Sequence, residues 1–492
     1  MRIDFFEEGE KKYGNADDVV KDLNLNFIAR NMAHENYGDI PFILEVLQCP
    51  LTSEEKIAKR QQVVLAACEN LNVISSLRKV IVKTWEDLEC SVKAIHDSRG
   101  KHLMEQTVIG IQVEGIRGLI NGLQSIHEIL QKNRTLFETS ALSVFYHSFY
   151  EEEPVEILEE QKALVLHLDS FKDKGEILLR AKIGEGFSLN DVEVLAVSGK
   201  ARRISGGIFS AKRGQVVADE EVYQSSVEFT NKVILQLLEQ CFPFLQRWQD
   251  CLYDMMRQIV FLTGCAKLYE RGLGCGMYFC FPKREEEQAE KVYELSLALQ
   301  TLTMPIYNTV SLTKYGSIIV TGANQGGKST FLRSLGIAQV MCQAGMFVAA
   351  QTYPLHAYDD MFTHFTRRED VTMNMGKFEE ELKRMGEILC GAKRNTLLLL
   401  NESFATTTEV TAFQIATDLI HACMEHEVTV WMVTHITKFA KELYEEKRPD
   451  ILFLSAGRQA DKEIRYQMYE KEPGDTSYGL ELYEQMIEKE RG

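Results

Sequence analysis

The sequence predicts a multidomain protein of the α and α/β classes, in which long helices and a small β-rich insert precede an α/β domain. Three observations support this fold class. No proline lies between Pro50 and Pro154, and this interval shows helical periodicity. From about 155 to 220, short β-rich segments are separated by Gly, Asp and Asn. The second half alternates apolar strands with helical patterns, which is typical of a largely parallel sheet.

Composition places the chain among ordinary globular proteins. Its 492 residues exceed one compact domain, and 45% of them are hydrophobic while 26% are charged. No apolar run is long enough to span a membrane, and the charged N-terminus MRIDFFEEGEKKYG lacks the apolar core of a secretory signal. The eleven cysteines are dispersed without a C-x-x-C pair, which argues against both a disulfide framework and zinc. We therefore expect a cytoplasmic protein with no membrane partner.

The first half predicts two helical stretches that flank a small sheet. Helical periodicity covers KIAKRQQVVLAACENLNVISSLRKVIVKTWEDL and returns in VILQLLEQCFPFLQRWQDCLYDMMRQIVFLTGCAKLYERG. Between them, the expected strands are ALVLHLDSF, GEILLRAKIG, DVEVLAVSG and ISGGIFSA. This order indicates two long antiparallel helical arms with a β tip, although periodicity alone also fits a plain helical bundle.

A basic segment lies within the β-rich insert. GKARRISGGIFSAKRG contains Lys200, Arg202, Arg203, Lys212 and Arg213, and no acid occurs from Val194 to Ala218. The formal charge of the whole chain is -17, which argues against a large electrostatic DNA footprint but does not exclude a local basic patch. The segment is either a solvated loop face or a tip that contacts phosphates.

The second half predicts a parallel sheet. SIIVTG, TLLLLNE, VTVWMVTH and ILFLSA have the composition of buried strands, and EIRYQMYEK alternates as an edge strand does. The stretch PKREEEQAEKVYE, near 282 to 294, precedes this region. We interpret it as a linker or as an exposed helix.

A phosphate-binding loop connects the first of these strands to a helix. TGANQGGKST fits the pattern Gly-x-x-x-x-Gly-Lys-Ser of the P-loop, beginning at Gly322. Its backbone N–H groups and the following helix N-terminus favour phosphate oxygens. Lys328 is expected to reach the β- and γ-phosphates of ATP, and Ser329 to ligate Mg²⁺.

Three residues at the ends of the next two strands are candidates for the hydrolytic chemistry. Glu402 follows TLLLLN and would polarise the attacking water. Asn401 takes the position where such ATPases usually have Asp, so it would hold Mg²⁺ through a water but without charge, which predicts slower turnover. His435 ends a buried strand and would sense the γ-phosphate. The alternative interpretation of Glu402 is an ordinary helix N-cap. The alternative interpretation of His435 is a structural histidine.

The P-loop region carries a family resemblance. TGANQGGKSTFLRSLGIAQVMCQAGMFVAA resembles the P-loop segment of the MutS family of DNA mismatch-repair ATPases, and Asn324, Gly326 and Arg333 stand where the family has the same residues. Further matches follow in order: DDMFTHFTRRED, LLLLNESFATTTEVTAF, VTVWMVTHITKFAKEL and PGDTSYGLELYEQM. The expected ATP-binding residues are Gly322, Asn324, Gly326, Gly327, Lys328, Ser329 and Thr330.

The resemblance implies that the chain ends in an ABC-type P-loop NTPase domain. It also implies that the preceding residues form the core, lever and clamp of the family. IPFILEVLQCPLTSEEKIAKRQQVV, residues 40 to 64, is weakly similar to the family's core segment. The implied division is 1–152 helical core and outgoing lever, 153–222 small clamp-like tip, 223–285 returning lever and core, and 286–492 ATPase domain. Because no mismatch-reading domain has room before residue 40, we expect a short MutS-like protein that lacks this domain and its connector.

The sequence departs from the family pattern at two loops. Ser403 to Thr406 read SFAT where the family has Gly-Arg-Gly-Thr. The family's signature loop, Ser-Thr-Phe-Met, reaches the partner subunit's γ-phosphate, whereas the aligned residues here begin with Gly376 and Lys377. The serine hydroxyl is therefore absent, and Lys377 would supply a charge instead.

The function implied by the resemblance is that of a slow ATPase acting on DNA. A homodimer would sandwich two nucleotides, and ATP binding and hydrolysis would drive a clamp on mismatched, branched or otherwise distorted double-stranded DNA. The basic segment would then contact DNA. Asn401 and the altered signature loop support an alternative, a nucleotide-switched clamp on DNA or protein with little or no hydrolysis. The absence of an LSGGQ-type signature argues against a transport or chromosome-organising ATPase.

Overall fold

The computed structural model divides the chain into two compact units. It describes residues 3–98, 105–152, 176–183, 189–198, 220–303, 305–312, 316–322, 326–366, 376–457 and 466–474. The helical unit comprises Met1–Phe5 and Asn72–Ile259, and the sheet unit comprises Phe6–Leu71 and Val260–Gly492. The four-part division expected from the family resemblance stays a prediction.

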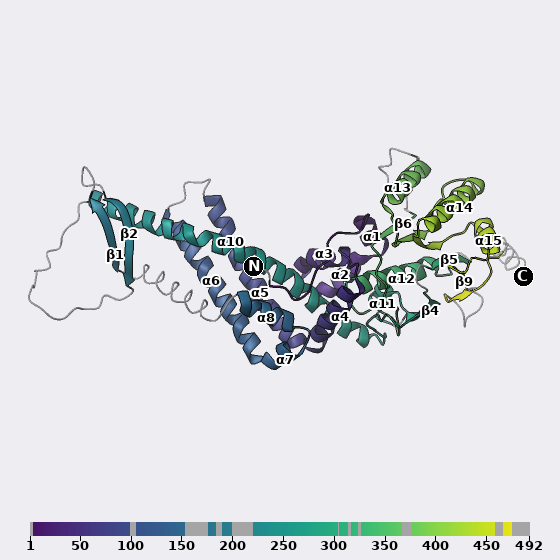
Figure 1. Ribbon diagram of the computed structural model, residues 1–492, viewed down its shortest axis with the longest axis horizontal. Coiled ribbons are helices and arrows are strands. Elements are labelled where there is room, and N and C mark those ends of the chain that lie inside the picture. Colours follow the sequence, from purple (N-terminus) through teal and green to yellow (C-terminus); the bar gives the residue numbers. More distant parts are fainter. Residues whose placement is uncertain are drawn as a thin grey trace, which may run out of the picture. The chain divides into compact units, whose positions relative to one another are not determined.

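Long helices form most of the helical unit (Figure 1). The long ones are α5 (Leu71–Ser98), α6 (Glu105–Lys132) and α10 (Glu220–Gly274), of which α10 ends in the sheet unit, and the short ones are α7 (Arg134–Thr139) and α8 (Ser143–Glu152). Helices α5 and α6 pack closely at Gly122. A Cβ atom at this position would lie only 2.1 Å from Oγ1 of Thr84, so only glycine leaves room for the contact. Aromatic side chains fill the core near α8, where the rings of Phe5 and Phe145 stack at 3.8 Å between centroids.

Two strands of the β-rich insert are described, β1 (Glu176–Ile183) and β2 (Leu189–Ser198). They pair antiparallel with register shifts, as the sequence predicts for GEILLRAKIG and DVEVLAVSG. The other two expected strands lie outside the described residues. The same holds for the five basic residues, Lys200, Arg202, Arg203, Lys212 and Arg213.

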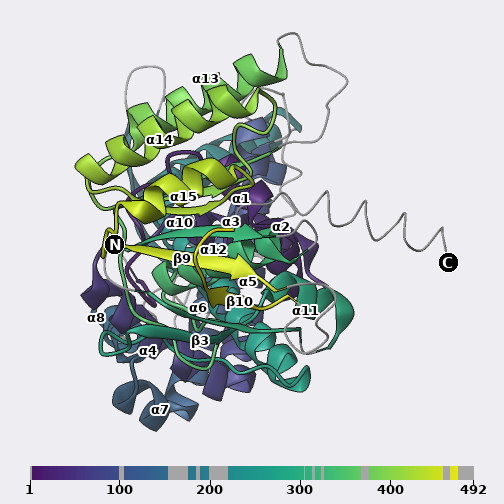
Figure 2. The same ribbon diagram turned by 90° about the vertical axis from the view of Figure 1, so that its right-hand side faces the viewer.

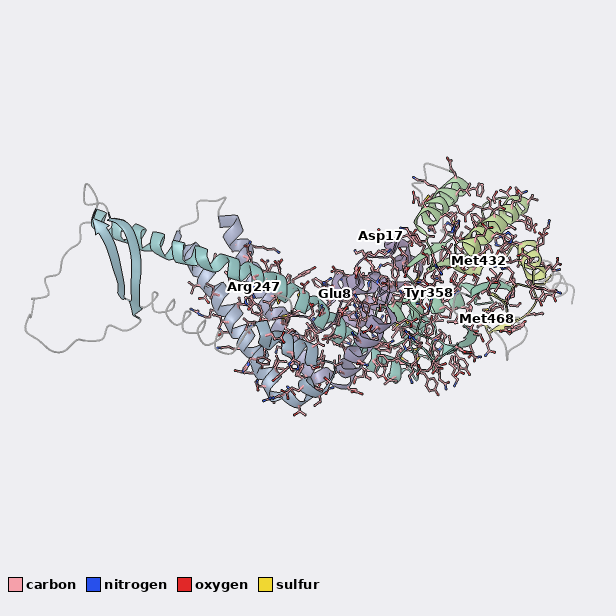
Figure 3. The ribbon with its side chains drawn as sticks, in the orientation of Figure 1. Glu8, Asp17, Arg247, Tyr358, Met432 and Met468 are labelled. Carbon is pink, nitrogen blue, oxygen red and sulfur yellow. The ribbon has the colours of Figure 1, made fainter. Side chains whose placement is uncertain are left out.

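The sheet unit is built on a six-stranded sheet with the order β10-β9-β5-β8-β7-β6. The strands are β5 (Ser317–Gly322), β6 (Asp360–Phe365), β7 (Thr396–Asn401), β8 (Thr429–Val433), β9 (Ile451–Ala456) and β10 (Met468–Glu470). All neighbours are parallel except β10, which pairs antiparallel with β9 at one edge. Figure 3 labels Met432 in β8 and Met468 in β10. The mixed helical and α/β prediction is thus confirmed, and of the six strands of this sheet only β6 was not predicted.

Helices cover both faces of this sheet (Figure 2). The helices are α12 (Lys328–Gln343), α13 (Lys377–Gly391), α14 (Glu409–Glu425) and α15 (Thr437–Glu445). Leu398 and Leu400 of β7 belong to a core cluster with α13, α14 and α15. Leu399 points to the other face, where it lies 3.4 Å from a Cβ built on Gly336 of α12. The alternation of side chains along β7 therefore buries both faces.

The N-terminal part of the sheet unit packs against the same sheet. Its elements are α1 (Ala16–Asp22), α2 (Leu25–Ala33), η1 (Tyr37–Asp39), α3 (Ile40–Gln48) and α4 (Glu54–Glu69). The Asn15 side chain donates to the Thr363 carbonyl at 2.8 Å and accepts from the Thr363 N–H at 3.3 Å. Asn15 thereby occupies backbone groups of the edge strand β6. On α12, Nε of Arg333 donates to the Asp22 carbonyl at 3.1 Å.

A smaller antiparallel pair precedes the main sheet. Strand β3 (Gln288–Val292) pairs with β4 (Asn308–Ser311), and the short helix α11 (Leu295–Thr301) lies between them in the chain. The stretch near 282 to 294 was expected to be a linker or an exposed helix, and both expectations are wrong. Ala289 and Val292 are buried, so this charged stretch carries enough apolar side chains to form a strand.

Within the part of the chain that the structure describes, no helix is both long enough and apolar enough to cross a bilayer.

Candidate functional site

Two glycines turn the chain between β5 and α12. Gly322, the last residue of β5, has φ 114°, and a Cβ there would lie 2.8 Å from the backbone nitrogen of Ala456. Gly327 has φ 85° and directly precedes α12. Both angles favour glycine, which explains why the loop needs these residues. The loop thus presents the N-terminus of α12, a site that attracts anions. Asn324 lies outside the described residues.

Lys328 is the first residue of α12, and its side chain is almost completely enclosed. It is 4% exposed, and Nζ donates a hydrogen bond to the Gly322 carbonyl at 2.8 Å. Burial lowers the pKa of Lys328, while the nearby Glu402 carboxylate raises it. A cation held inside the protein in this way requires negative partners, and Glu402 is the first of them.

Ser329 connects the P-loop helix to the neighbouring element of the site. Its Oγ donates a hydrogen bond to Oδ1 of Asn401 at 2.8 Å. Asn401 ends β7, and β8 lies between β7 and the P-loop strand β5. The sequence-predicted pair for Mg²⁺ is therefore brought together, with one hydroxyl and one neutral amide oxygen as the oxygen donors.

Glu402 follows Asn401 in a left-handed backbone conformation. Its φ is 53°, and its N–H donates to the Val433 carbonyl of β8 at 2.9 Å. Oγ1 of Thr366, just after β6, donates to the Glu402 carbonyl at 2.8 Å. These contacts hold the backbone of Glu402 at the carboxyl edge of the parallel strands, where ligands of open α/β sheets bind.

A cavity of about 570 Å³ is lined by Lys328, Ser329 and Glu402, whereas Asn401 is not among its described lining residues. Two acids, Glu294 and Glu402, line it, as do five residues at the turn into α12, namely Gly326, Gly327, Lys328, Ser329 and Thr330. Its volume lies within the range of small-molecule and cofactor sites. The structure therefore places five of the expected ATP-binding residues and the expected catalytic acid around one space.

Apolar and aromatic residues outside the predicted motifs also line the cavity. Among them are Leu297 of α11, Ile306 before β4 and Tyr466 before β10. Leu297 and Ile306 are 39% and 49% exposed, so they present apolar surface to a ligand. Glu294 holds the start of α11 in place because its carboxylate accepts hydrogen bonds from the Leu297 N–H and the Ser296 hydroxyl. No local motif marks these residues, because they belong to three separate segments.

Neither His435 nor Gly376 is among the described residues that line the cavity. His435 is exposed, two residues beyond the end of β8, and the preceding Thr434 donates its N–H to the Val320 carbonyl at 3.0 Å. Gly376 is exposed and precedes α13, which begins at Lys377. The sensing role of His435 and the action of Gly376 and Lys377 on a partner subunit stay predictions.

Comparison with known proteins identifies this region. The family model of MutS domain V matches residues 318–488, which include the P-loop, Asn401, Glu402 and the sheet from β5 to β10. This stretch of the chain is therefore similar to MutS domain V, which is consistent with a member of the MutS family.

Three MutS relatives illustrate how far the likeness extends. DNA mismatch repair protein MutS of Petrotoga mobilis is 32% identical over 171 residues, which are 34% of this chain and 20% of the relative. A mitochondrial DNA mismatch repair protein mutS homolog of Sarcophyton glaucum is 28% identical over 202 residues, or 41% and 20% of the two chains. MutS of Streptococcus pneumoniae is 24% identical over 274 residues, or 53% and 31%. The chain thus spans about a fifth to a third of the length of the MutS proteins it matches.

Proposed function

We propose that the sheet unit is an ABC-type P-loop ATPase that binds ATP and Mg²⁺ in the 570 Å³ cavity. One observation carries this proposal. Lys328, Ser329 and Glu402 line one cavity together with apolar residues such as Leu297 and Ile306, and Ser329 is hydrogen-bonded to Asn401. In this proposal Lys328 suits the phosphates, and the Ser329–Asn401 pair suits a divalent cation. Glu402 suits the attacking water, and the apolar residues suit the nucleobase.

Each group of the cavity has a part in this proposal. The N-terminus of α12 and Lys328 would bind the phosphates, and Lys328 would exchange its contact with Gly322 for phosphate oxygens. Ser329 would ligate Mg²⁺, while Asn401 would hold a water of its shell. The bound Mg²⁺ would neutralise phosphate charge. The nucleobase of ATP would lie against Leu297 and Ile306.

Glu402 is the proposed general base. Its carboxylate lies near the ammonium of Lys328, and its side chain lines the cavity into which Lys328 also points. As a lining residue of the cavity, Glu402 would accept a proton from the water that attacks the γ-phosphate. Asn401 brings no charge to the metal, and slow hydrolysis is therefore expected. The same observation favours the second candidate, a nucleotide-switched clamp in which ATP binds but is hardly hydrolysed.

The proposed biological role is ATP-dependent binding of distorted or mismatched double-stranded DNA in a repair-type process. Its support is the MutS domain V and relatives whose names denote DNA mismatch repair. We further propose a cytoplasmic homodimer in which Gly376 and Lys377 act on the nucleotide of the partner subunit. The basic segment between Lys200 and Arg213 would contact DNA phosphates.

Nucleotide binding and turnover test the ATPase proposal. The full chain, Lys328→Ala and Glu402→Gln would be compared by equilibrium binding of a fluorescent ATP analogue and by phosphate release. We expect Lys328→Ala to lose most ATP affinity, and Glu402→Gln to keep the affinity but lose at least tenfold in kcat. Lys383→Ala, on the exposed surface of α13, is the matched control. ATP binding that is unaffected in Lys328→Ala would refute the site. Tight binding without turnover in the full chain would select the second candidate.

A gel shift at defined salt tests the DNA proposal. Homoduplex, mismatched and four-way-junction DNA would be compared with no nucleotide, ADP, ATP and a non-hydrolysable analogue, with Lys328→Ala as the control for nucleotide dependence. Preference for one distorted structure in one nucleotide state would support the clamp. Absence of binding in every state would overturn the DNA part of the proposal.

A further inference from the structure

The loop after the proposed base has a conformation that local sequence preference does not explain. Glu402 and Phe404 have φ angles of 53° and 67°, and neither is a glycine. Two left-handed residues so close together are unfavourable for L-amino acids and persist only where the surroundings hold them. Contacts with neighbouring side chains must therefore hold the loop from Glu402 to Phe404 in this conformation.

Glu381 of α13 is bonded to this loop through both carboxylate oxygens. Oε1 accepts the Phe404 N–H at 2.6 Å, and Oε2 accepts the Thr406 hydroxyl at 2.6 Å. Glu381 is 7% exposed, and Phe404 is fully buried in the core between the sheet, α13 and α14. A buried carboxylate with two short bonds of this kind is a strong and directional anchor.

The other side of the loop is bound to the edge strand β6. The Ser403 hydroxyl lies 2.7 Å from Nδ1 of His364, and both residues are fully buried. Thr366 Oγ1 is shared between the carbonyls of Asn401 and Glu402, at 3.0 and 2.8 Å. Of the segment from 401 to 404, Glu402 is the residue found in the lining of the cavity, whereas Ser403 and Phe404 are fully buried.

We propose that Glu381 is a positioning residue for Glu402. Its two hydrogen bonds fix the left-handed turn, and the turn directs the Glu402 carboxylate into the cavity. Glu381 lies on the second turn of α13, which begins at Lys377, so any displacement of α13 is passed to the base through a rigid contact. Turnover, rather than nucleotide affinity, therefore depends on where α13 lies. This inference rests on the proposed role of Glu402.

The test separates kcat from ATP affinity in four variants of the full chain. Glu381→Ala removes both bonds. Thr406→Val removes one at an exposed residue and is the milder variant if Glu381→Ala folds poorly. Glu381→Gln keeps one acceptor oxygen. Glu387→Ala, an exposed glutamate on the same helix, is the matched control. We expect kcat to fall at least tenfold in Glu381→Ala and severalfold in Thr406→Val, with partial rescue in Glu381→Gln and no change in Glu387→Ala.

ATP affinity should stay within about twofold of that of the unmodified chain in all four variants, because the phosphate-binding loop is untouched. The double variant Glu381→Ala with Thr406→Val should lose no more kcat than Glu381→Ala alone. Equal losses of affinity and kcat, or an unchanged kcat in Glu381→Ala and Thr406→Val, would overturn the inference. If Glu402→Gln also leaves turnover unchanged, the proposed function itself fails. If turnover depends on Glu402 but not on Glu381, only this inference fails.

Discussion

The hydroxyl of Ser329 donates a 2.8 Å hydrogen bond to Oδ1 of Asn401, and this contact connects the first turn of α12 to the end of β7. An aspartate at position 401 would place a negative charge at the same oxygen. Asparagine keeps the position and the accepting oxygen but removes the charge. Under the proposed function, Asn401 would therefore attract Mg²⁺ less strongly than an aspartate would.

Asn401→Asp should strengthen Mg²⁺ binding to the ATP-loaded protein. The added carboxylate lies next to the Ser329 hydroxyl, so the Mg²⁺ concentration for half-maximal turnover should fall about tenfold, and kcat should rise. A magnesium titration of phosphate release measures both. Asn401→Ala is the opposite control, because it removes the oxygen and should weaken Mg²⁺ use. An Asn401→Asp variant with the same magnesium dependence as the unmodified chain would show that this residue is remote from the metal.

Gly322→Ala should damage the phosphate-binding loop. The φ of 114° is unfavourable for alanine, and the new Cβ would lie 2.8 Å from the Ala456 nitrogen. We expect a loss of about 2 kcal/mol in the free energy of unfolding and weaker ATP binding. Urea denaturation followed by circular dichroism gives the first quantity. Gly386→Ala in α13 is the matched control, because its Cβ would meet no atom within 4 Å, and it should stabilise the protein by up to about 1 kcal/mol.

His364 should make the stability of the sheet unit depend on pH. Burial, assisted by the charge of Arg384, lowers the pKa of His364 from 6.5 to about 4. Below pH 6.5 the unfolded chain binds a proton that the folded protein does not bind. Stability should therefore fall as the pH falls from about 6.5 to about 4, by at most about 3 kcal/mol from this residue. Above pH 6.5 this contribution is constant.

Urea midpoints measured between pH 4 and pH 8 test the titration of His364. His364→Asn should flatten the dependence below pH 6.5, whereas His426→Asn, at an exposed position, should leave it unchanged. An unaltered slope in His364→Asn would mean that other groups dominate the acid sensitivity.

Arg202→Ala combined with Arg203→Ala should weaken DNA binding in a salt-dependent way. If both side chains contact phosphates, the slope of log K against log salt should become less steep by about 0.9 for each lost contact. Gel shifts over a range of potassium chloride concentrations measure the slope. Lys383→Ala controls for a general loss of positive charge. Equal slopes for the double variant and the control would leave the basic segment without a role in DNA binding.

Much of the site could be predicted because its chemistry depends on short, contiguous patterns. A phosphate-binding turn needs Gly322, Gly327, Lys328 and Ser329 at fixed spacing, and the strand that ends in Glu402 is an uninterrupted apolar run. These parts are encoded locally, and the structure places Lys328, Ser329 and Glu402 around one cavity.

The parts that the sequence did not predict depend on contacts between distant segments. The apolar and aromatic lining of the cavity includes Leu297, Ile306 and Tyr466, none of which carries a recognisable pattern. Glu381 resembles its exposed helical neighbours until the fold brings Phe404 to it. Strand β6, with the sequence DMFTHF, is fully buried although it contains polar residues, and these are accommodated by contacts such as that of His364 with Ser403.

The sheet unit is assembled from two separated portions of the chain, Phe6–Leu71 and Val260–Gly492. During translation the first portion leaves the ribosome before any strand of the six-stranded sheet exists. Leu23 packs near Gly336 of α12, and Asn15 binds β6. The partners of both residues are synthesised later, after a delay on the order of tens of seconds. Newly made chains should therefore be most vulnerable to proteases and most dependent on chaperones during this interval, and a separately expressed 286–492 fragment would lack the natural cover of its edge strand.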